Sequence, residues 1–300
     1  MTTSPRLLSP LRCLWDAAAT LGEGTCWSER EQALYWVDIL GHTLYRCDAN
    51  GGERRQWHFD ETVSAVAERQ DRPGLAVALR RGLALFDPDS GRLERLHQPE
   101  PERTGNRFND GKCDPAGRFW AGSMDFDCRA PTGALYCYGA DGRAVRAADL
   151  GWAVTNGPTW SLDGRTLYVN HTVERAVWAF DVDPGSGRIT RPRLWLRFDP
   201  DDGYPDGMTT DAEGRLWIAH WGAACVSCHD PDTAAELLRV PLPASHITNV
   251  AFGGAALRTL FITSARFGLD PAQLAAEPQA GALFAIDTDT TGLPANAFAG

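Results

Sequence analysis

The sequence predicts an all-β protein built as a six-bladed β-propeller. A motif recurs along the chain at intervals of about 45 residues, which is typical of propellers and other repeat proteins. Thirty glycines and nineteen prolines are spread over the 300 residues, which favours many short elements joined by tight turns. No segment of ten or more residues shows a convincing amphipathic helix pattern, and the best helical candidate is the short stretch Asp270 to Glu277.

Three copies of the repeat are clear, at residues 113–122, 160–169 and 210–219. Each reads as a strand, a turn built on Asp-x-x-Gly or Asp-Gly, and a second strand rich in aromatic and β-branched residues. The turn glycines are Gly117, Gly164 and Gly214. Glycine tolerates positive φ and aspartate bonds its own backbone, so both residues suit tight turns.

Three weaker copies complete the set, at residues 26–38, 65–79 and 250–263. A third strand follows each copy, and these strands are expected at 43–48, 83–87, 134–138, 177–181, 225–229 and 282–287. Six units of about 45 residues use nearly the whole chain. We therefore expect residues 1–300 to form a single propeller domain, with a strand at about 12–17 closing the last blade. A β-sandwich or an open repeat array is the alternative, but the regular spacing without a long linker disfavours both.

Composition and charge limit the classes of molecule that this protein is expected to bind. The net charge of −10 opposes binding to phosphate backbones and anionic lipid, so no nucleic acid or membrane partner is expected. We find no apolar run of the roughly 18 residues that a membrane span requires, and no signal peptide, so a cytoplasmic location is expected. Eight cysteines in a reducing compartment should mostly be small buried side chains. We expect a monomer or a weak dimer.

One cysteine motif matches a cofactor pattern in an unsuitable context. Cys225-Val-Ser-Cys228-His229 matches the pattern of covalent haem attachment. The motif falls in a predicted strand, where residues three apart point to opposite faces, and the chain shows no export signal. We therefore do not expect haem.

Polar residues precede the first predicted strand of each repeat. They are Glu23, Ser64, Asn109, Asn156, Asp206 and Asn249. Equivalent positions of successive blades surround one axis at one end of a propeller, so two carboxylates and several amides should converge there. Convergent carboxylates repel each other unless a cation lies between them, and oxygen ligands suit a hard divalent ion. The alternative is that these residues only cap turns.

The chain also resembles the SMP-30/gluconolactonase/regucalcin-like group of sugar lactonases. The resemblance covers about residues 21 to 285 and depends on short motifs that occur in the right order. These are Leu21-Gly-Glu-Gly24, Arg107-Phe-Asn-Asp-Gly-Lys112, Asp114-Pro-Ala-Gly-Arg118, Ala121-Gly-Ser-Met124, Thr155-Asn-Gly157, Pro205-Asp-Gly207, Asp211-Ala-Glu-Gly-Arg-Leu-Trp217, Phe252-Gly-Gly254 and Thr263-Ser-Ala-Arg266. Each motif is weak alone, but together they are specific.

The resemblance implies roles for particular residues. Glu23, Asn156 and Asp206 would be ligands of one divalent metal ion, which could be Ca, Zn, Mn, Mg or Fe. Arg107 and Asn109 would bind substrate. Asp206 is our candidate for the general base, because a carboxylate can accept the proton of an attacking water.

Two further assignments are looser. Asp127, with Asp125 as second choice, is expected as an acidic substrate contact. His171 stands where members of this family often have aspartate. A surface turn is one interpretation of His171, and an influence on substrate selectivity, or a nearby metal or proton site, is the other.

These features predict metal-dependent hydrolysis of a sugar lactone to the free aldonic acid, with the small lactone as the partner molecule. Trp221 and Tyr204 could stack on the sugar, although packing between blades explains them equally well. The alternative functions are a non-catalytic calcium-binding propeller, or a related esterase or phosphotriesterase.

Overall fold

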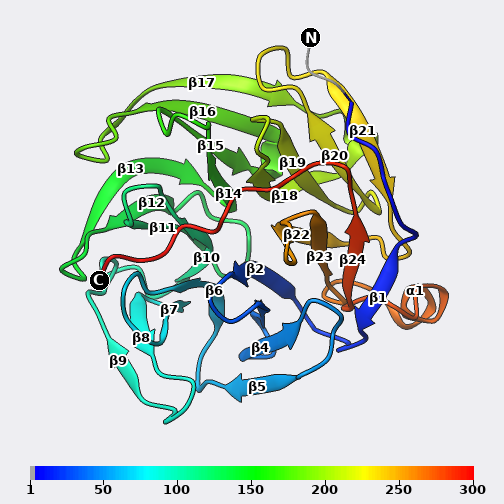
Figure 1. Ribbon diagram of the computed structural model, residues 1–300. Helices are drawn as coiled ribbons and strands as arrows, with labels where there is room; N and C mark the ends of the chain where they lie inside the picture. Colours follow the sequence, from blue (N-terminus) through cyan, green and yellow to red (C-terminus); the bar gives the residue numbers. More distant parts are fainter. Residues whose placement is uncertain (1–3) are drawn as a thin grey trace.

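Six four-stranded antiparallel sheets surround one axis in the computed structural model, which describes residues 4–300 (Figure 1). The predicted six-bladed β-propeller is confirmed. The first three blades are β2 (Gly22–Ser28), β3 (Ala33–Asp38), β4 (Thr43–Asp48) and β5 (Arg55–His58); β6 (Val63–Glu68), β7 (Leu75–Leu79), β8 (Leu83–Phe86) and β9 (Leu93–Arg95); and β10 (Asn106–Cys113), β11 (Phe119–Asp125), β12 (Gly133–Tyr138) and β13 (Ala144–Trp152).

The last three blades follow the same plan. They are β14 (Thr155–Trp160), β15 (Thr166–His171), β16 (Ala176–Val182) and β17 (Ile189–Arg197); β18 (Tyr204–Thr210), β19 (Leu216–Trp221), β20 (Cys225–His229) and β21 (Glu236–Pro241); and β22 (Ile247–Gly253), β23 (Thr259–Ser264), β24 (Leu283–Asp287) and β1 (Arg12–Trp15). The N-terminal strand β1 pairs with β24, the last strand of the chain, so the first and last strands share one blade (Figure 1).

The repeated Asp-x-x-Gly-Arg-x-Trp motif folds as one hydrogen-bonded unit. Asp114 accepts bonds from two backbone amides of its own turn, from Arg118 Nε at 2.6 Å and from Trp120 Nε1 at 2.8 Å. Asp211 repeats this network two blades later, with Trp217 Nε1 at 2.9 Å. The turn glycine that follows Asp114, Gly117, has a φ of 78°, which a residue with a side chain rarely adopts. The motif therefore fastens a turn to the buried indole of the next strand.

Apolar side chains fill the spaces between neighbouring blades. The largest fully buried ones are aromatic, and they include Trp27, Trp36, Trp120 and Trp217. Five of the eight cysteines, at 26, 47, 113, 225 and 228, are buried free thiols, as predicted for most of them. Cys13 and Cys128 are exposed.

Helical structure is sparse in residues 4–300. The helix α1 (Pro271–Ala276) begins after Asp270, which forms a capping box with Gln273. Two single 3₁₀ turns, η1 (Thr172–Glu174) and η2 (Pro200–Asp202), complete the set. No helix of these residues has the length and apolar character needed to cross a membrane.

The six innermost strands, β2, β6, β10, β14, β18 and β22, follow one another around the axis. Each has a register irregularity of the β-bulge type at the same place, beside the polar residue predicted to face the axis. The sequence placed these residues just before the first strands. They lie inside the strands instead, as Glu23 does in Gly22–Ser28. The bulge redirects a side chain within the strand, and sequence spacing alone does not reveal it.

Candidate functional site

Polar side chains from four blades meet around a cavity of about 250 Å³ at one end of the axis. Its lining includes five of the predicted site residues, which are Glu23, Arg107, Asn109, Asn156 and Asp206. Each of these five is only 3% to 5% exposed. The bulges of the innermost strands therefore bring together residues that lie more than a hundred positions apart in the sequence.

The two carboxylates of the cavity share a buried environment. Burial raises the pKa of Glu23 well above its usual value, and the charges of Asp206 and Asp110 raise it further. Burial also raises the pKa of Asp206 well above its usual value, and the negative charge of Asp110 raises it further. Glu23 Oε2 accepts hydrogen bonds from Gly24 N at 3.0 Å and from Asn249 Nδ2 at 3.0 Å. The Oδ1 atom of Asp206 is buried without a hydrogen-bond partner among the described residues.

A directional chain of hydrogen bonds fixes the amides. Arg107 Nη1 donates to Asn109 Oδ1 at 2.6 Å, and Asn109 Nδ2 donates to Asn156 Oδ1. Asn156 Nδ2 then donates to Thr172 Oγ1 at 3.0 Å, and this hydroxyl donates to the carbonyl of Pro205 at 2.9 Å. Because every amide nitrogen is occupied as a donor, the orientation of each side chain is determined. No sequence pattern predicts Thr172, which lies just after β15, as part of the site.

A second layer of polar residues lies behind the residues that line the cavity and supports them. Asp110 Oδ2 accepts bonds from Gly157 N at 2.9 Å and Asn249 Nδ2 at 3.3 Å. Asn249 therefore bridges Asp110 and Glu23, and its Oδ1 accepts a bond from Thr25 Oγ1 at 2.7 Å. Burial raises the pKa of Asp110, while the charge of Lys112 lowers it. Asn249 belongs to the predicted polar ring, but no sequence pattern indicates that Asp110 supports it.

Aromatic residues form part of the cavity wall. Tyr204 and Trp221 both line it, as does Phe267. Trp221 stacks on His246 with ring centroids 3.9 Å apart, and the guanidinium of Arg175 lies 4.1 Å from the ring centroid of Tyr204. Packing contacts therefore hold the rings of Tyr204 and Trp221, and both rings also line the cavity.

The loop after β11 differs from the expectation for substrate contacts. Asp127 is exposed and does not line the cavity, and Asp125 uses its Oδ2 to accept bonds from Arg129 N and Ala130 N. The lining residues of this segment are Met124 and Cys128. A role of Asp127 in substrate binding stays a prediction.

His171 is buried beneath the surface rather than placed on an exposed turn. Its ring stacks on Trp152, with centroids 4.6 Å apart and an interplanar angle of 4°. Its Nδ1 lies 3.5 Å from Glu174 Oε2, and burial lowers the pKa of its imidazole. His171 does not line the cavity, although its neighbour Thr172 does.

The cavity fits a divalent cation on two grounds. The donor set of two carboxylates and an amide oxygen is the kind that hard ions prefer. In addition, Asp206 offers a buried oxygen without a partner among the described residues, next to a second carboxylate. The negative charges of the two carboxylates repel each other. A cation at this place would offset the cost of burying both charges.

Comparison with known proteins agrees with the fold and shows the family. The family model described as SMP-30/Gluconolactonase/LRE-like region matches residues 21–266. An L-arabinolactonase of Azospirillum brasilense is 37% identical over 289 residues, which is 96% of this chain and 95% of that protein. Regucalcin of Gallus gallus is 34% identical over 296 residues, 97% of this chain and 98% of that protein.

A solved structure is also similar over its full length. It is described as a calcium-binding protein, regucalcin, from Agrobacterium tumefaciens, and it superposes with a TM-score of 0.91 at 27% identity, covering 99% of both chains. The fold and the axial site thus define a six-bladed propeller of the lactonase and regucalcin type. The chain belongs to the SMP-30/gluconolactonase/LRE-like family.

Proposed function

We propose that this protein is a metal-dependent lactonase, which hydrolyses a sugar lactone of the aldonolactone type to the free aldonic acid during sugar oxidation. The observation that carries this proposal is the buried pair Glu23 and Asp206, with Asp206 Oδ1 without a partner among the described residues, in a cavity that Arg107 also lines. Family membership and the name of the L-arabinolactonase relative support it.

Glu23, Asn156 and Asp206 would hold one divalent ion, of Ca, Zn, Mn, Mg or Fe. When bound, this ion would supply Lewis-acid polarisation of the lactone carbonyl. The description of the Agrobacterium relative as calcium-binding supports a divalent ion.

The protein side chains perform the remaining tasks. Asp206 accepts the proton of the attacking water as general base, because a carboxylate has a second oxygen for this purpose. Arg107 donates hydrogen bonds to sugar hydroxyls or to the ring carbonyl, and the fixed fork of the guanidinium suits developing negative charge. Both N–H groups of the Asn109 amide are already used within the protein, so Asn109 binds the sugar by accepting a hydrogen bond from a hydroxyl at its Oδ1. Tyr204 and Trp221 enclose the sugar from the cavity wall.

Two other functions differ from this proposal in testable ways. A non-catalytic calcium-binding propeller would use the carboxylates but would not require the chain of hydrogen bonds from Arg107 to Thr172. An esterase or phosphotriesterase would use the same residues on a different substrate. The ordered donors around the carboxylates favour hydrolysis over ion binding alone.

The test is an assay of pentono- and hexonolactones, as 1,4 and 1,5 ring forms, with metal-free protein supplied with each of the five ions. We expect hydrolysis that depends on the ion. Asp206→Ala should lose both hydrolysis and ion affinity, whereas Arg107→Met should lose hydrolysis and keep ion affinity. If no lactone is hydrolysed with any ion while calcium still binds, the lactonase proposal is wrong and the binding function is supported.

A further inference from the structure

A second cavity lies on the same axis, beyond the site described above. Its volume is about 330 Å³, which is within the range of small-molecule pockets. The innermost strands run from the first cavity into this one, so that β2 contributes Glu23 to the first and Thr25 to the second. The layer of Asp110 and Asn249 separates the two cavities. A ligand in the second cavity would therefore not overlap a substrate in the first.

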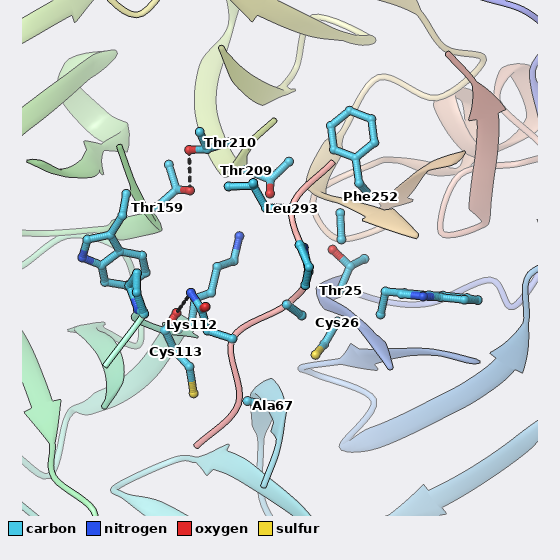
Figure 2. Close-up of a pocket in the computed structure, with 18 of the residues that line it drawn as sticks. Thr25, Cys26, Ala67, Lys112, Cys113, Thr159, Thr209, Thr210, Phe252 and Leu293 are labelled. Carbon is cyan, nitrogen blue, oxygen red and sulfur yellow. Dashed lines mark hydrogen bonds between the residues drawn. The ribbon is translucent and has the colours of Figure 1, made fainter. Parts of the chain in front are cut away.

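Lys112 projects into the middle of this second cavity. Figure 2 shows its amino group among the side chains of Thr25, Thr159, Thr209 and Thr210. It is the only lysine of the 300 residues and the only charged side chain among the described residues that line the cavity. Lys112 Nζ donates to the carbonyl of Met208 at 2.7 Å. An ammonium has three N–H donors, so two are left for an acceptor inside the cavity.

The Lys112 ammonium is not paired in an ion pair within the described residues. Two aspartates lie two residues from Lys112 in the sequence. Asp110 directs its oxygens to Gly111 N, Gly157 N and Asn249 Nδ2, and Asp114 directs its oxygens to its own turn, Arg118 and Trp120. Burial lowers the pKa of Lys112, and the charge of Asp110 acts in the opposite direction. The cavity thus holds a single buried cation inside a protein whose net charge is −10.

Hydroxyl groups and aromatic rings complete the lining. Thr159 Oγ1 and Thr210 Oγ1 lie 2.9 Å apart and share one hydrogen bond, so the pair retains one hydroxyl proton for a ligand. Trp27, Trp160 and Phe252 form apolar wall. A charged end and an apolar body are therefore both accommodated.

The C-terminal segment covers this cavity. It runs across the innermost strands (Figure 1), and Leu293 and Asn296 line the cavity from it. Gly292 pairs with Asp211 and Phe298 pairs with Arg69, so the segment is held at both sides of the axis. Asn296 Nδ2 donates to the carbonyl of Cys113 at 3.1 Å. The cover restricts the cavity to small ligands.

We propose that this second cavity binds a small organic monocarboxylate. Its carboxylate accepts hydrogen bonds from Lys112 Nζ and from the Thr159–Thr210 hydroxyl pair, and its body packs against Trp27, Trp160 and Phe252. One cation neutralises one negative charge, whereas a dianion would leave surplus negative charge beside Asp110. The inference does not depend on the proposed lactonase activity.

Because Lys112 is the only lysine, its chemical modification reports on this cavity alone. We would measure dimethylation of Lys112 by formaldehyde and dimethylamine-borane with peptide mass spectrometry, using the N-terminal amine as internal reference. Sodium benzoate at about 10 mM should slow the modification of Lys112 about fivefold, as expected for a Kd of a few mM. Sodium chloride at equal ionic strength and the neutral analogue benzamide should have no effect.

A second experiment repeats the measurement with sodium gluconate. Gluconate is an aldonate, and aldonates are the class of product that lactone hydrolysis releases. Protection by both carboxylates would identify the hydrolysis product as one source of the ligand, and protection by benzoate alone would indicate an apolar carboxylate. No protection by either carboxylate, or equal protection by benzamide, would overturn the proposal.

Variants separate this cavity from the first. Thr209→Phe fills the second cavity and leaves Lys112 in place, and Thr209→Val is its matched control of nearly unchanged size. In calorimetric titration, benzoate binding should disappear in Thr209→Phe and persist in Thr209→Val and in Arg107→Met. Binding that persists in Thr209→Phe but disappears in Arg107→Met would place the benzoate in the first cavity and contradict the proposal. Lys112→Met should abolish binding if the variant folds.

Discussion

At the residue scale, the candidate site brings two carboxylic groups together before any ion binds. The pKa of Asp206 is raised above its unfolded value of about 3.9, mainly by burial. In the metal-free protein, the contribution of this group to stability is therefore fully present below that value and is lost as the pH rises through the raised pKa. The metal-free protein is destabilised at neutral pH by the same carboxylates that we propose as ligands of the ion.

The first prediction follows from this cost. In the presence of a chelator at pH 8, Asp206→Asn should raise the free energy of unfolding by about 1–3 kcal/mol, because it removes a buried unpaired charge. The gain should vanish near pH 3.5, roughly the pKa of an unfolded aspartate. Urea denaturation at several pH values measures both. The exposed Asp127→Asn is the control and should change little. Equal stability of Asp206→Asn and wild type at pH 8 would contradict the prediction.

The second prediction concerns Asn249, which bridges Glu23 and Asp110. Asn249→Ala removes both bonds and leaves Glu23 Oε2 with only the bond from Gly24 N, so the carboxylate is held less firmly. Affinity for divalent ions should fall about 10–100-fold, as is common when a residue behind a metal ligand is removed. Titration calorimetry measures the affinity. Asn106→Ala is the matched control, because Asn106 is also a buried asparagine of an innermost strand but bonds Glu100 instead. An ion affinity within about twofold of wild type would show that Asn249 does not position the site.

At the element scale, the β-bulges of the innermost strands direct the polar side chains to the axis. The bulge in β18 lies between Pro205 and Met208 and contains Gly207. A Cβ atom on Gly207 would lie 2.6 Å from Asn249 Cγ, far inside van der Waals contact. Glycine is therefore required here by the close approach of the neighbouring blade.

The third prediction tests this approach. Gly207→Ala should push Asn249 away, cost about 1–3 kcal/mol of stability through overpacking, and weaken ion binding. Gly105→Ala is the control, because a Cβ atom there meets nothing within 4 Å, and its effect should stay within about 0.5 kcal/mol. Thermal unfolding and ion titration of both variants provide the measurement. Wild-type ion affinity in Gly207→Ala would show that Asn249 tolerates the displacement.

At the scale of the whole molecule, strand β1 completes the blade that contains the C-terminal strand β24. We infer that the chain forms one domain whose ring is closed by this pairing. Without β1, the edge of β24 would be exposed and the side chain of Leu14 would leave the core.

The fourth prediction is that removal of residues 1–15 lowers the melting temperature by several degrees or more and promotes association through the exposed edge. Removal of residues 1–4 is the control and should leave the melting temperature nearly unchanged. Differential scanning calorimetry and sedimentation velocity measure the two effects. A monomeric 16–300 chain with the wild-type melting temperature would show that the ring does not depend on β1.

The sequence by itself determined the number of blades, the first three strands of each blade to within a few residues, and the polar residues that repeat from blade to blade. It could do so because turn chemistry and strand alternation are local properties, so each Asp-x-x-Gly turn marks a blade independently of the others. The best helical candidate of the sequence, Asp270 to Glu277, contains the short helix α1. Family motifs then distinguished Glu23, Asn156 and Asp206 from the other members of the ring.

Only the tertiary structure decided how these residues contact one another. Asp110, Thr172 and Cys128 reach the site or its support through bulges and loops whose geometry depends on the adjacent blades. The exposure of Asp127 and the burial of His171 against Trp152 were also beyond local rules, because they depend on how loops fold over neighbouring sheets. The axial metal-ion site remains a prediction, now supported by two buried carboxylates that repel each other until a cation binds.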